Sequence, residues 1–322
     1  MRFTFTAALL GAATASAPSA KFMEYIITYG KSYATVEEFN FRKTIFTEND
    51  IKIQRLNSDP TATYTVGHNK MSDWTHDEYR RLLGFRPSAE PEITTTTYFN
   101  NATAAPDSVN WVTAGAVQAV RDQGQCGSCW AFSSMGCIES AHWIASGESI
   151  DTSEQQLVDC SNLNSGCNGG WQSMAFKYFA SHGVMTEKSY PYTALTQTCK
   201  YSSNNTGITV PSYTKVTPES VAQFKAAVAQ QPISVSIEAD TFSFQSYKSG
   251  VYNHADKCGT TLDHAVIAVG YGTDSVGGDY YLIRNSWGAS WGEDGYIRFA
   301  VTGDDAGMCG VQLGPLYPTV NK

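Results

Sequence analysis

The sequence predicts an α+β protein in which a helical leader precedes a body with one helical lobe and one β-rich lobe. Three observations support this prediction. Helix patterns gather before about residue 215 and strand patterns follow it. All eight cysteines lie beyond residue 125, and the segment 86–108 has no apolar period. A length of 322 residues also predicts about two domains.

The composition supplies ample material for a core and excludes several classes of protein. Hydrophobic residues make up 42% of the chain, which is incompatible with a wholly disordered protein. The 22 Lys and Arg against 30 Asp and Glu give a net charge of -8, so the chain lacks the basic footprint of a nucleic-acid binder. No apolar run reaches the roughly 18–20 residues of a membrane span, and we expect no membrane anchor.

The first 17 residues have the pattern of a secretory signal peptide. The chain opens with the basic Arg2, continues with an apolar stretch over 3–13, and then reads Ala15-Ser16-Ala17. A basic start, a short apolar centre and an A-x-A end are typical of such signals, whereas the alternative is an ordinary N-terminal core helix. Secretory routing permits disulfides, although the sequence does not fix their connectivity.

Residues 21–85 read as a separately organised helical region. Six residues recur at steps of three or four, which places them on one helix face: Glu38, Arg42, Phe46, Asn49, Ile53 and Asn57. Glu38 and Arg42 can form an ion pair, which stabilises a helix by a few tenths of a kcal/mol. Taken as periodicity alone, the row favours a solvated amphipathic helix.

The segment 86–108 reads as a flexible linker that proteases can reach. It contains Pro87, Pro91, a threonine run over 94–97 and Pro106. Two triplets match the glycosylation sequon, at Asn101 and at Asn204. Such triplets also arise by chance.

The body divides into a helical and a strand-rich half that meet near residue 215. Helical patterns cover Ser128–His142 and Ser153–Asp159. Strand patterns cover Ile233–Glu238, Ala265–Gly270, Tyr280–Arg284 and Gly295–Phe299. Pockets favour junctions of this kind, so we expect the functional site between the two lobes.

The segment 123–132 carries the sharpest chemical signal. Cys129 follows a glycine-rich stretch and begins a predicted helix, whose N-terminal dipole and N–H groups stabilise the nucleophilic thiolate. A structural disulfide, a redox pair and half of a zinc site are alternatives for Cys126-Gly127-Ser128-Cys129. A zinc site lacks a second ligand pair of suitable spacing, and a redox pair lacks a βαβ context.

Three further residues could complete the site of a thiol nucleophile. His264, one of six histidines, lies at the mouth of a predicted strand, where a base would be held rigidly. Asn285 follows another strand and could accept the ring N–H, while Trp287 could shield that hydrogen bond from water. Gln123 could donate its side-chain N–H to a developing oxyanion beside the Cys129 N–H. Each alone also fits an ordinary core, turn or loop position.

Together these segments resemble the papain-like cysteine proteases. Residues 126–130 fit the C-G-[SA]-C-[WY] pattern of that family, and His264 and Asn285 follow Cys129 at separations of 135 and 156 residues. The N-S-W-G run at 285–288 and the G-C-N-G-G run at 166–170 are also family-like. The resemblance extends from about Lys21 to Tyr317.

The resemblance implies a papain-like two-lobe fold and peptide hydrolysis through a thioester acyl-enzyme. It assigns Cys129 as the nucleophile, His264 as the acid–base, Asn285 as the group that orients it, and Gln123 as the oxyanion donor. The disulfides that it implies join Cys126 to Cys167, Cys160 to Cys199, and Cys258 to Cys309. Cys137 matches no family disulfide and reads as a small buried hydrophobe, with a reactive second thiol as the alternative.

The same resemblance identifies the leader as an inhibitory propeptide of the cathepsin L branch. The row over 38–57 matches E-x3-R-x3-F-x2-N-x3-I-x3-N, and residues 67–73 resemble G-x-N-x-F-x-D with Met71 in place of Phe. We therefore expect a signal peptide at 1–17, a propeptide at 18–104 and a peptidase at 105–322. Its helical lobe would cover about 105–215 and its β-rich lobe about 216–322. No insertion with paired histidines is visible, which favours an endopeptidase.

By resemblance, five residues wall the main specificity pocket: Trp171, Ser236, Leu262, Ala265 and Gly314. Gly170 would hold the substrate backbone, and Asp263 and Trp287 complete the implied substrate-binding set. Gly314 places no negative charge at the pocket floor. We therefore expect an apolar or aromatic side chain to be preferred over arginine.

We expect a monomer that acts on protein or peptide substrates, uses no metal or cofactor, and is inhibited by its own propeptide. Its location would be the secretory pathway, in a lysosome-like acidic compartment or outside the cell. Acid would release the leader by protonating carboxylates, with cleavage between about Thr94 and Pro106. The competing functions are a non-catalytic binding protein on the same scaffold and a dithiol oxidoreductase that uses Cys126 and Cys129.

Overall fold

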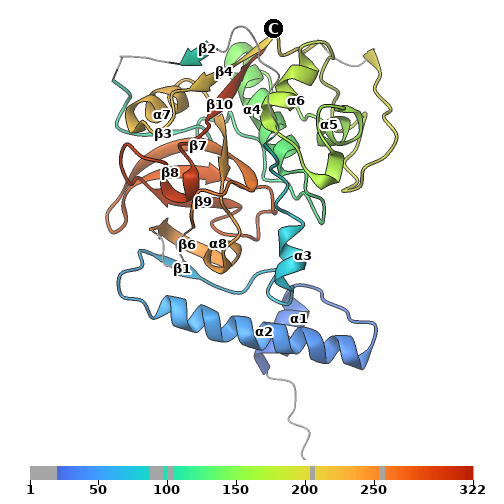
Figure 1. Cartoon of the computed structure of the whole chain (residues 1–322), viewed down its shortest axis with the longest axis vertical. Coiled ribbons are helices and arrows are strands. Elements are labelled where there is room, and N and C mark those ends of the chain that lie inside the picture. The colour runs from blue at the N-terminus through green and yellow to red at the C-terminus, as the bar shows by residue number, and fades with distance from the viewer. Residues whose placement is uncertain (1–19, 88–96, 100–103, 204–206, 254–257, 322) are drawn as a thin grey trace, which may run out of the picture.

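The computed structural model describes residues 20–87, 97–99, 104–203, 207–253 and 258–321. The predicted signal peptide, the sequons at Asn101 and Asn204, and most of the predicted linker lie outside these ranges. The leader lies at one end of the molecule and a body of helices and sheet forms the rest, as Figure 1 shows. The predicted α+β class is confirmed.

The leader contains three helices and one short strand. They are α1 (Ala20–Thr28), α2 (Val36–Asn57), β1 (Tyr64–Val66) and α3 (His76–Arg80). The α2 helix begins where the Thr35 side chain accepts the Glu38 N–H at 3.1 Å, which satisfies one of the free N–H groups of the first turn. A small aromatic cluster of Phe22, Tyr25 and Phe46 holds α1 against α2.

The periodic row of α2 is a packed face. Phe46, Asn49 and Ile53 are buried, and Asn49 donates its side-chain N–H to the Ser72 carbonyl at 3.0 Å. Arg42 lies 3.8 Å from Glu38, as predicted, and also donates to the α3 residue Glu78 at 2.6 and 2.7 Å. The prediction of a solvated face is therefore wrong, because later leader residues cover the row.

The helical lobe is built around α4 (Cys129–Ser146), which is buried from Cys129 to Ala141. It ends at Gly147, whose φ of 76° is a left-handed conformation that suits glycine. Around α4 lie α5 (Glu154–Cys160), the 3-10 turn η1 (Gly166–Asn168) and α6 (Gln172–Phe179). The helices predicted at 128–142 and 153–159 are confirmed as α4 and α5.

One sheet links the β-rich lobe to the leader. Over the described residues it has ten strands, in the order β1-β6-β9-β8-β7-β5-β10-β4-β2, with β3 paired to β7. The strands of the body are β3 (Val109–Asn110), β4 (Ser212–Val216), β5 (Ile233–Ile237), β6 (Tyr247–Tyr252), β7 (His264–Asp274), β8 (Gly278–Arg284), β9 (Tyr296–Ala300) and β10 (Leu316–Thr319). The helices α7 (Val221–Val228) and α8 (Phe242–Gln245) and the turn η3 (Met308–Gly310) accompany them. The four predicted strands correspond to β5, β7, β8 and β9.

Strands from outside the β-rich lobe join this sheet at three places. At one end β1 pairs antiparallel with β6, and at the other β2 (Thr97–Phe99) pairs in parallel with β4. The sequence indicates neither strand: β1 lies within the region that is predicted to be helical, and β2 lies within the predicted linker. In addition, β3, which precedes α4 in the chain, pairs with β7 of the β-rich lobe.

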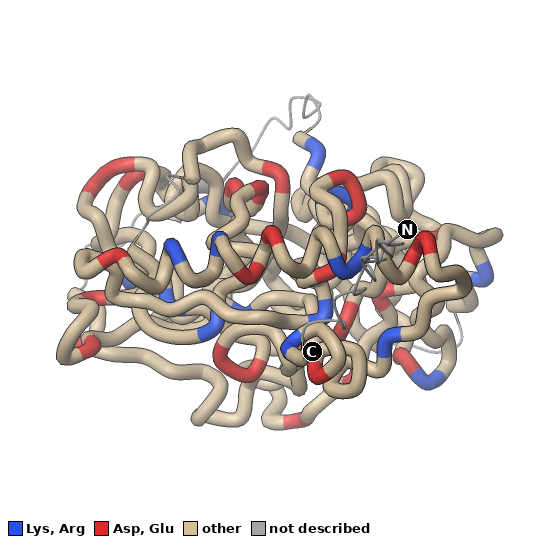
Figure 2. The backbone as a smooth tube through the Cα atoms, turned by 90° about the horizontal axis from the view of Figure 1, so that it is seen from below, with Lys and Arg blue, Asp and Glu red and all other residues tan. Residues whose placement is uncertain are grey.

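The view from the leader side shows acidic and basic residues interspersed along α2 (Figure 2). From Ala105 onward the sequence has 11 Lys and Arg against 19 Asp and Glu, so the body carries the acidic charge. Within the described ranges, no helix combines the length and the apolar character that crossing a bilayer requires.

Candidate active site

Cys129 lies where the first turn of α4 meets the first residues of β7. Its side chain is fully buried, and its Sγ accepts the N–H of Ala265 at 3.4 Å. Ala265 directly follows His264, the first residue of β7. Two predicted site residues that are far apart in the sequence are thus brought together, because one begins a helix of the first lobe and the other begins a strand of the second.

Asn285 orients the imidazole of His264. The distance between His264 Nε2 and Asn285 Oδ1 is 2.8 Å, and both side chains are buried. The ring of Trp287 lies 4.8 Å from the imidazole, centroid to centroid, and shields this bond from water. With Nε2 as the donor, Nδ1 becomes the acceptor, and this buried atom has no hydrogen-bond partner. It is the nitrogen that can take a proton from a neighbouring thiol.

Gln123 presents its amide N–H groups next to the same site. Its side chain is fully buried, and its Nε2 donates to the Leu82 carbonyl at 2.8 Å and to the Cys126 carbonyl at 2.7 Å. Ser286 Oγ donates to the amide oxygen of Gln123 at 2.7 Å, while the Ser286 N–H donates to Asn285 Oδ1 at 2.8 Å. Ser286 therefore fixes the direction in which the Gln123 amide points.

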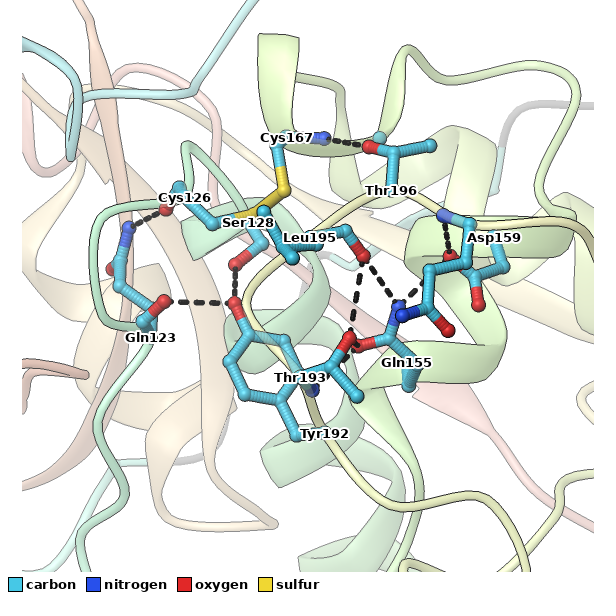
Figure 3. Close-up of a disulfide and its surroundings, with 12 residues drawn as sticks. Gln123, Cys126, Ser128, Gln155, Asp159, Cys167, Tyr192, Thr193, Leu195 and Thr196 are labelled. Atoms are coloured by element: carbon cyan, nitrogen blue, oxygen red, sulfur yellow. Dashed lines mark hydrogen bonds between the residues drawn. A yellow bond between two sulfur atoms is a disulfide. The ribbon is translucent and has the colours of Figure 1, made fainter.

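A second set of bonds holds the loop that carries Gln123 (Figure 3). The hydroxyl of Tyr192 donates to the Gln123 carbonyl at 2.8 Å and lies 2.6 Å from Ser128 Oγ, immediately before Cys129. Sequence reasoning missed both Tyr192 and Ser286. Ser286 lies inside the N-S-W-G run, so its motif was visible without its role, whereas no local pattern marks Tyr192.

Three disulfides cross-link the body, and they join the pairs that the resemblance implied. The bonds are Cys126–Cys167, Cys160–Cys199 and Cys258–Cys309, while Cys129 and Cys137 are free and buried. Because Cys126 is bonded to Cys167, it forms no redox pair with Cys129, which removes the basis of the oxidoreductase reading. The described residues also contain no group of three or more His, Cys, Asp or Glu arranged to hold a metal ion.

Burial keeps the thiol and the imidazole uncharged in this state. Burial raises the pKa of Cys129 to about 11, although the N–H groups of Ala265, Gly84 and Trp130 oppose that rise. Burial lowers the pKa of His264 to about 4, against the effect of its bond to Asn285. The helix N-terminus was expected to favour thiolate, but the loss of water outweighs it here.

The leader backbone lies across the groove beside Cys129. The N–H of Gly170 donates to the Gly84 carbonyl at 2.9 Å, and the Arg86 N–H donates to the Gly170 carbonyl at 2.9 Å. The Phe85 N–H donates to the Asp263 carbonyl at 2.8 Å. Gly170 and Asp263 thus hold peptide backbone, and the peptide they hold here is the leader itself.

The side chain of Phe85 enters a cavity at the lobe junction. Its ring meets that of Trp171 edge to face, with centroids 6.3 Å apart. The cavity has a volume of about 520 Å³, and its walls include Trp171, Ser236, Leu262 and Gly314. Ala265, the fifth residue of the implied pocket, is buried and is not among the lining residues; its N–H contacts Cys129 instead.

Comparison with known proteins decides the family. The family model described as papain family cysteine protease matches residues 105–319. The chain belongs to this family. A second model, described as cathepsin propeptide inhibitor domain, matches residues 22–79 of the leader. The protease therefore carries its own inhibitor domain, is made as a zymogen, and acts on peptide bonds.

The protease is similar to known relatives over nearly its whole length. It is 41% identical to digestive cysteine proteinase 1 of Homarus americanus, over 97% of this chain and 98% of the relative. It is 40% identical to cathepsin L of Sarcophaga peregrina, over 92% and 91%. The solved structure of digestive procathepsin L2 from Tenebrio molitor larval midgut superposes with a TM-score of 0.86 at 34% identity, over 93% of this chain and 98% of that one. These likenesses confirm the predicted cathepsin L-like branch.

Proposed function

We propose that Cys129, His264, Asn285 and Gln123 carry out peptide hydrolysis in this protease. Cys129 transfers its proton to His264 Nδ1 and attacks the peptide carbonyl carbon. The oxyanion is held by Gln123 Nε2 and the Cys129 N–H, and its collapse breaks the C–N bond as His264 protonates the leaving amine. Water, deprotonated by His264, then hydrolyses the thioester to an acid and regenerates the thiol.

One observation carries this proposal: four groups from three chain segments converge beneath one stretch of bound backbone. The Leu82 carbonyl accepts a hydrogen bond from Gln123 Nε2, the group proposed to bind the oxyanion. The Gly84 N–H is within hydrogen-bonding reach of the Cys129 sulfur. Removing the leader would readmit water, lower the pKa of Cys129 and raise that of His264. The pair could then exist as thiolate and imidazolium.

We assign the propeptide to 18–104 and a monomeric endopeptidase to 105–322.

Thiol alkylation tests the nucleophile without changing the sequence. We expect iodoacetamide to inactivate the processed protease at neutral pH in proportion to modification of a single peptide, the one that carries Cys129. The unprocessed precursor should react far more slowly, because the leader covers the sulfur and raises its pKa. Peptide mass spectrometry gives the readout. Full inactivation with Cys129 unmodified would contradict the proposal.

We assign the cavity around Phe85 to the main specificity pocket. An aromatic side chain already occupies its mouth, and Trp171 and Leu262 provide apolar walls. The preference for an apolar or aromatic substrate residue over arginine follows from this arrangement. A binding protein on the same scaffold would not need the buried Ser286 bond that orients the Gln123 amide, so we favour catalysis.

Acid release of the leader requires a group that titrates at mildly acidic pH. A bond from Arg42 lowers the pKa of Glu78 to about 2, so this ion pair persists until well below pH 4. Burial lowers the pKa of His68, whose ring stacks on Phe46 with centroids 4.2 Å apart and whose Nε2 lies 3.1 Å from Asp50. The charged neighbours facing this ring are Asp50 and Lys21.

Protonation of His68 in acid destabilises the folded leader. Unfolded histidine titrates near 6.5, so the unfolded leader binds this proton more readily than the folded one. The stability of the folded leader is thus complete above about pH 6.5 and declines as the pH falls toward the lowered pKa of His68. We infer that protonation of His68 adds to the carboxylate effects expected from the sequence.

A His68→Phe precursor tests this inference. It keeps the stacked ring and cannot titrate, so we expect the midpoint pH of leader removal to fall by about half a unit or more. Gel analysis after incubation between pH 4 and 7 gives the midpoint. His182→Phe is the matched control, because that ring stacks on Tyr178 in the body at the same 4.2 Å spacing. Equal midpoints for wild type and His68→Phe would contradict the role of His68.

We place the protease in the secretory pathway, in an acidic lysosome-like compartment or outside the cell. The three disulfides support an oxidising route of synthesis. The His68 environment supports release at mildly acidic pH. Maturation of wild-type precursor at pH 4 but not at pH 7 is the expected result, whereas full activity of the intact precursor at both values would reject acid release.

A further inference from the structure

The leader helix α3 covers a surface of the body next to the catalytic imidazole. The hydroxyl of Tyr79 donates to the Ala239 carbonyl, and its ring meets that of Trp287 edge to face, with centroids 5.6 Å apart. Trp287 in turn lies against the ring of His264. The Ala239 N–H donates to Asp263 Oδ1 at 2.8 Å, and Asp263 directly precedes His264. The surface beneath α3 therefore adjoins the catalytic base, and removal of the leader opens it to a substrate.

Asp240 places a carboxylate on this surface. It follows Ala239 in the loop between β5 and α8. Its carboxylate oxygens lie 3.1 Å from His76 Nε2 and 3.5 Å from Arg80 Nε, and both partners belong to α3. Within the part of the chain that the structure describes, no other basic side chain lies within 4 Å of this carboxylate. Because both partners leave with the leader, the processed protease keeps the carboxylate and loses the basic groups that face it.

The order of contacts along the leader relates Asp240 to the nucleophile. The side chain of Phe85 enters the specificity pocket, and the Gly84 N–H reaches the Cys129 sulfur. Arg80, earlier in the leader, meets Asp240. The leader thus passes from the pocket, over the nucleophile, to Asp240. In a substrate whose acyl part fills the pocket, the part that leaves as the amine lies on the side of Asp240.

We propose that Asp240 is a specificity-determining residue that favours arginine or lysine within the first two residues after the scissile bond. The carboxylate faces the peptide held in the groove, and the cation that it meets in the precursor is an arginine side chain. A bound substrate displaces water from around the pair, which strengthens its attraction relative to bulk water, and a glutamate at the same place is repelled. The inference rests on the proposed function, because it requires cleavage at Cys129 with the acyl part in the pocket.

The test measures kcat/KM of the processed protease on internally quenched peptides that share their acyl part. Arginine, uncharged glutamine and glutamate are compared at each of the two positions after the scissile bond. Asp240 keeps an exposed fraction of 26% even beneath α3, so we expect Asp240→Asn to lower the Arg-to-Gln ratio about fivefold, as for a partly exposed ion pair. Asp240→Lys should reverse the order of arginine and glutamate, and Asp240→Glu should keep the wild-type order. Glu148→Gln, which removes an exposed carboxylate of the helical lobe, should leave every ratio unchanged.

A fluorogenic dipeptide separates specificity from catalysis. Its leaving group is a dye, so no substrate residue lies on the side of Asp240, and Asp240→Asn should keep its kcat/KM within about twofold of wild type. An unchanged Arg-to-Gln ratio in Asp240→Asn, or an equal loss on the dipeptide, overturns the role of Asp240 and leaves the thiol mechanism intact. If alkylation of Cys129 leaves cleavage of the quenched peptides intact, the proposed function itself fails, and this inference fails with it.

Discussion

Replacing Cys129 with alanine is expected to lower kcat/KM for peptide hydrolysis by at least about 10⁴-fold, because catalytic groups of this kind act as a unit whose loss leaves only binding and oxyanion stabilisation. Hydrolysis of a fluorogenic dipeptide under reducing, mildly acidic conditions gives the measurement. The alanine precursor should also fail to remove its own leader in acid while remaining a substrate for added wild-type protease. Activity that survives the substitution would remove the thiol mechanism.

Cys137 supplies a matched control from the same helix. It lies eight residues beyond Cys129 on α4, is fully buried and is the other free thiol. Burial raises its pKa, which makes it a poor nucleophile. Cys137→Ala should therefore lower stability by about 1 kcal/mol and leave kcat/KM within twofold of wild type. If Cys137→Ala lost as much activity as Cys129→Ala, the loss in Cys129→Ala would not be evidence that Cys129 is the nucleophile.

Residue type and motif spacing were sufficient to predict which side chains meet at the candidate site. Cys129 and His264 begin regular elements, and Asn285 follows one, so their positions could be inferred from predicted helix and strand ends. Their chemistry follows from the side chains themselves. The two-lobe arrangement followed from where helix and strand patterns gather, because those patterns span many residues and are locally encoded.

Features that depend on distant partners could not be predicted in this way. The strands β1 and β2 have three residues each, too few for a period, and they exist because β6 and β4 offer partners far along the chain. Ser286 and Tyr192 act through bonds to Gln123 that only folding creates. The raised pKa of Cys129 depends on burial that only the folded chain creates. A local sequence pattern shows that Cys129 begins a helix and therefore feels the helix dipole. It does not show that folding removes water from the thiol.

Replacing Gly84 with alanine is expected to disrupt inhibition by the leader more than any other single change in its backbone. The leader passes so close to the loop before α4 that a Cβ on Gly84 would overlap the carbonyl oxygen of Gly127. That carbonyl cannot easily move, because Gly127 is itself confined: its N–H donates to the Cys167 carbonyl at 2.9 Å, and its own Cβ would lie 2.6 Å from the same oxygen. The disulfide Cys126–Cys167 ties both sides of this contact together.

The Gly84→Ala leader must therefore withdraw, which would weaken the bond between Gly170 and residue 84 and the bond of Leu82 to Gln123. A loss of about 3 kcal/mol corresponds to roughly 100-fold weaker occlusion of the groove. We expect the freshly purified Gly84→Ala precursor to hydrolyse a dipeptide at pH 7 and to lose its leader at that pH, whereas the wild-type precursor is inactive there. Gly67→Ala is the control within the leader, because a Cβ there meets only the flexible Lys248 side chain, at 2.9 Å. A silent Gly84→Ala precursor would mean that inhibition does not depend on this backbone contact, and that α3 and the α1–α2 pair hold the leader in place on their own.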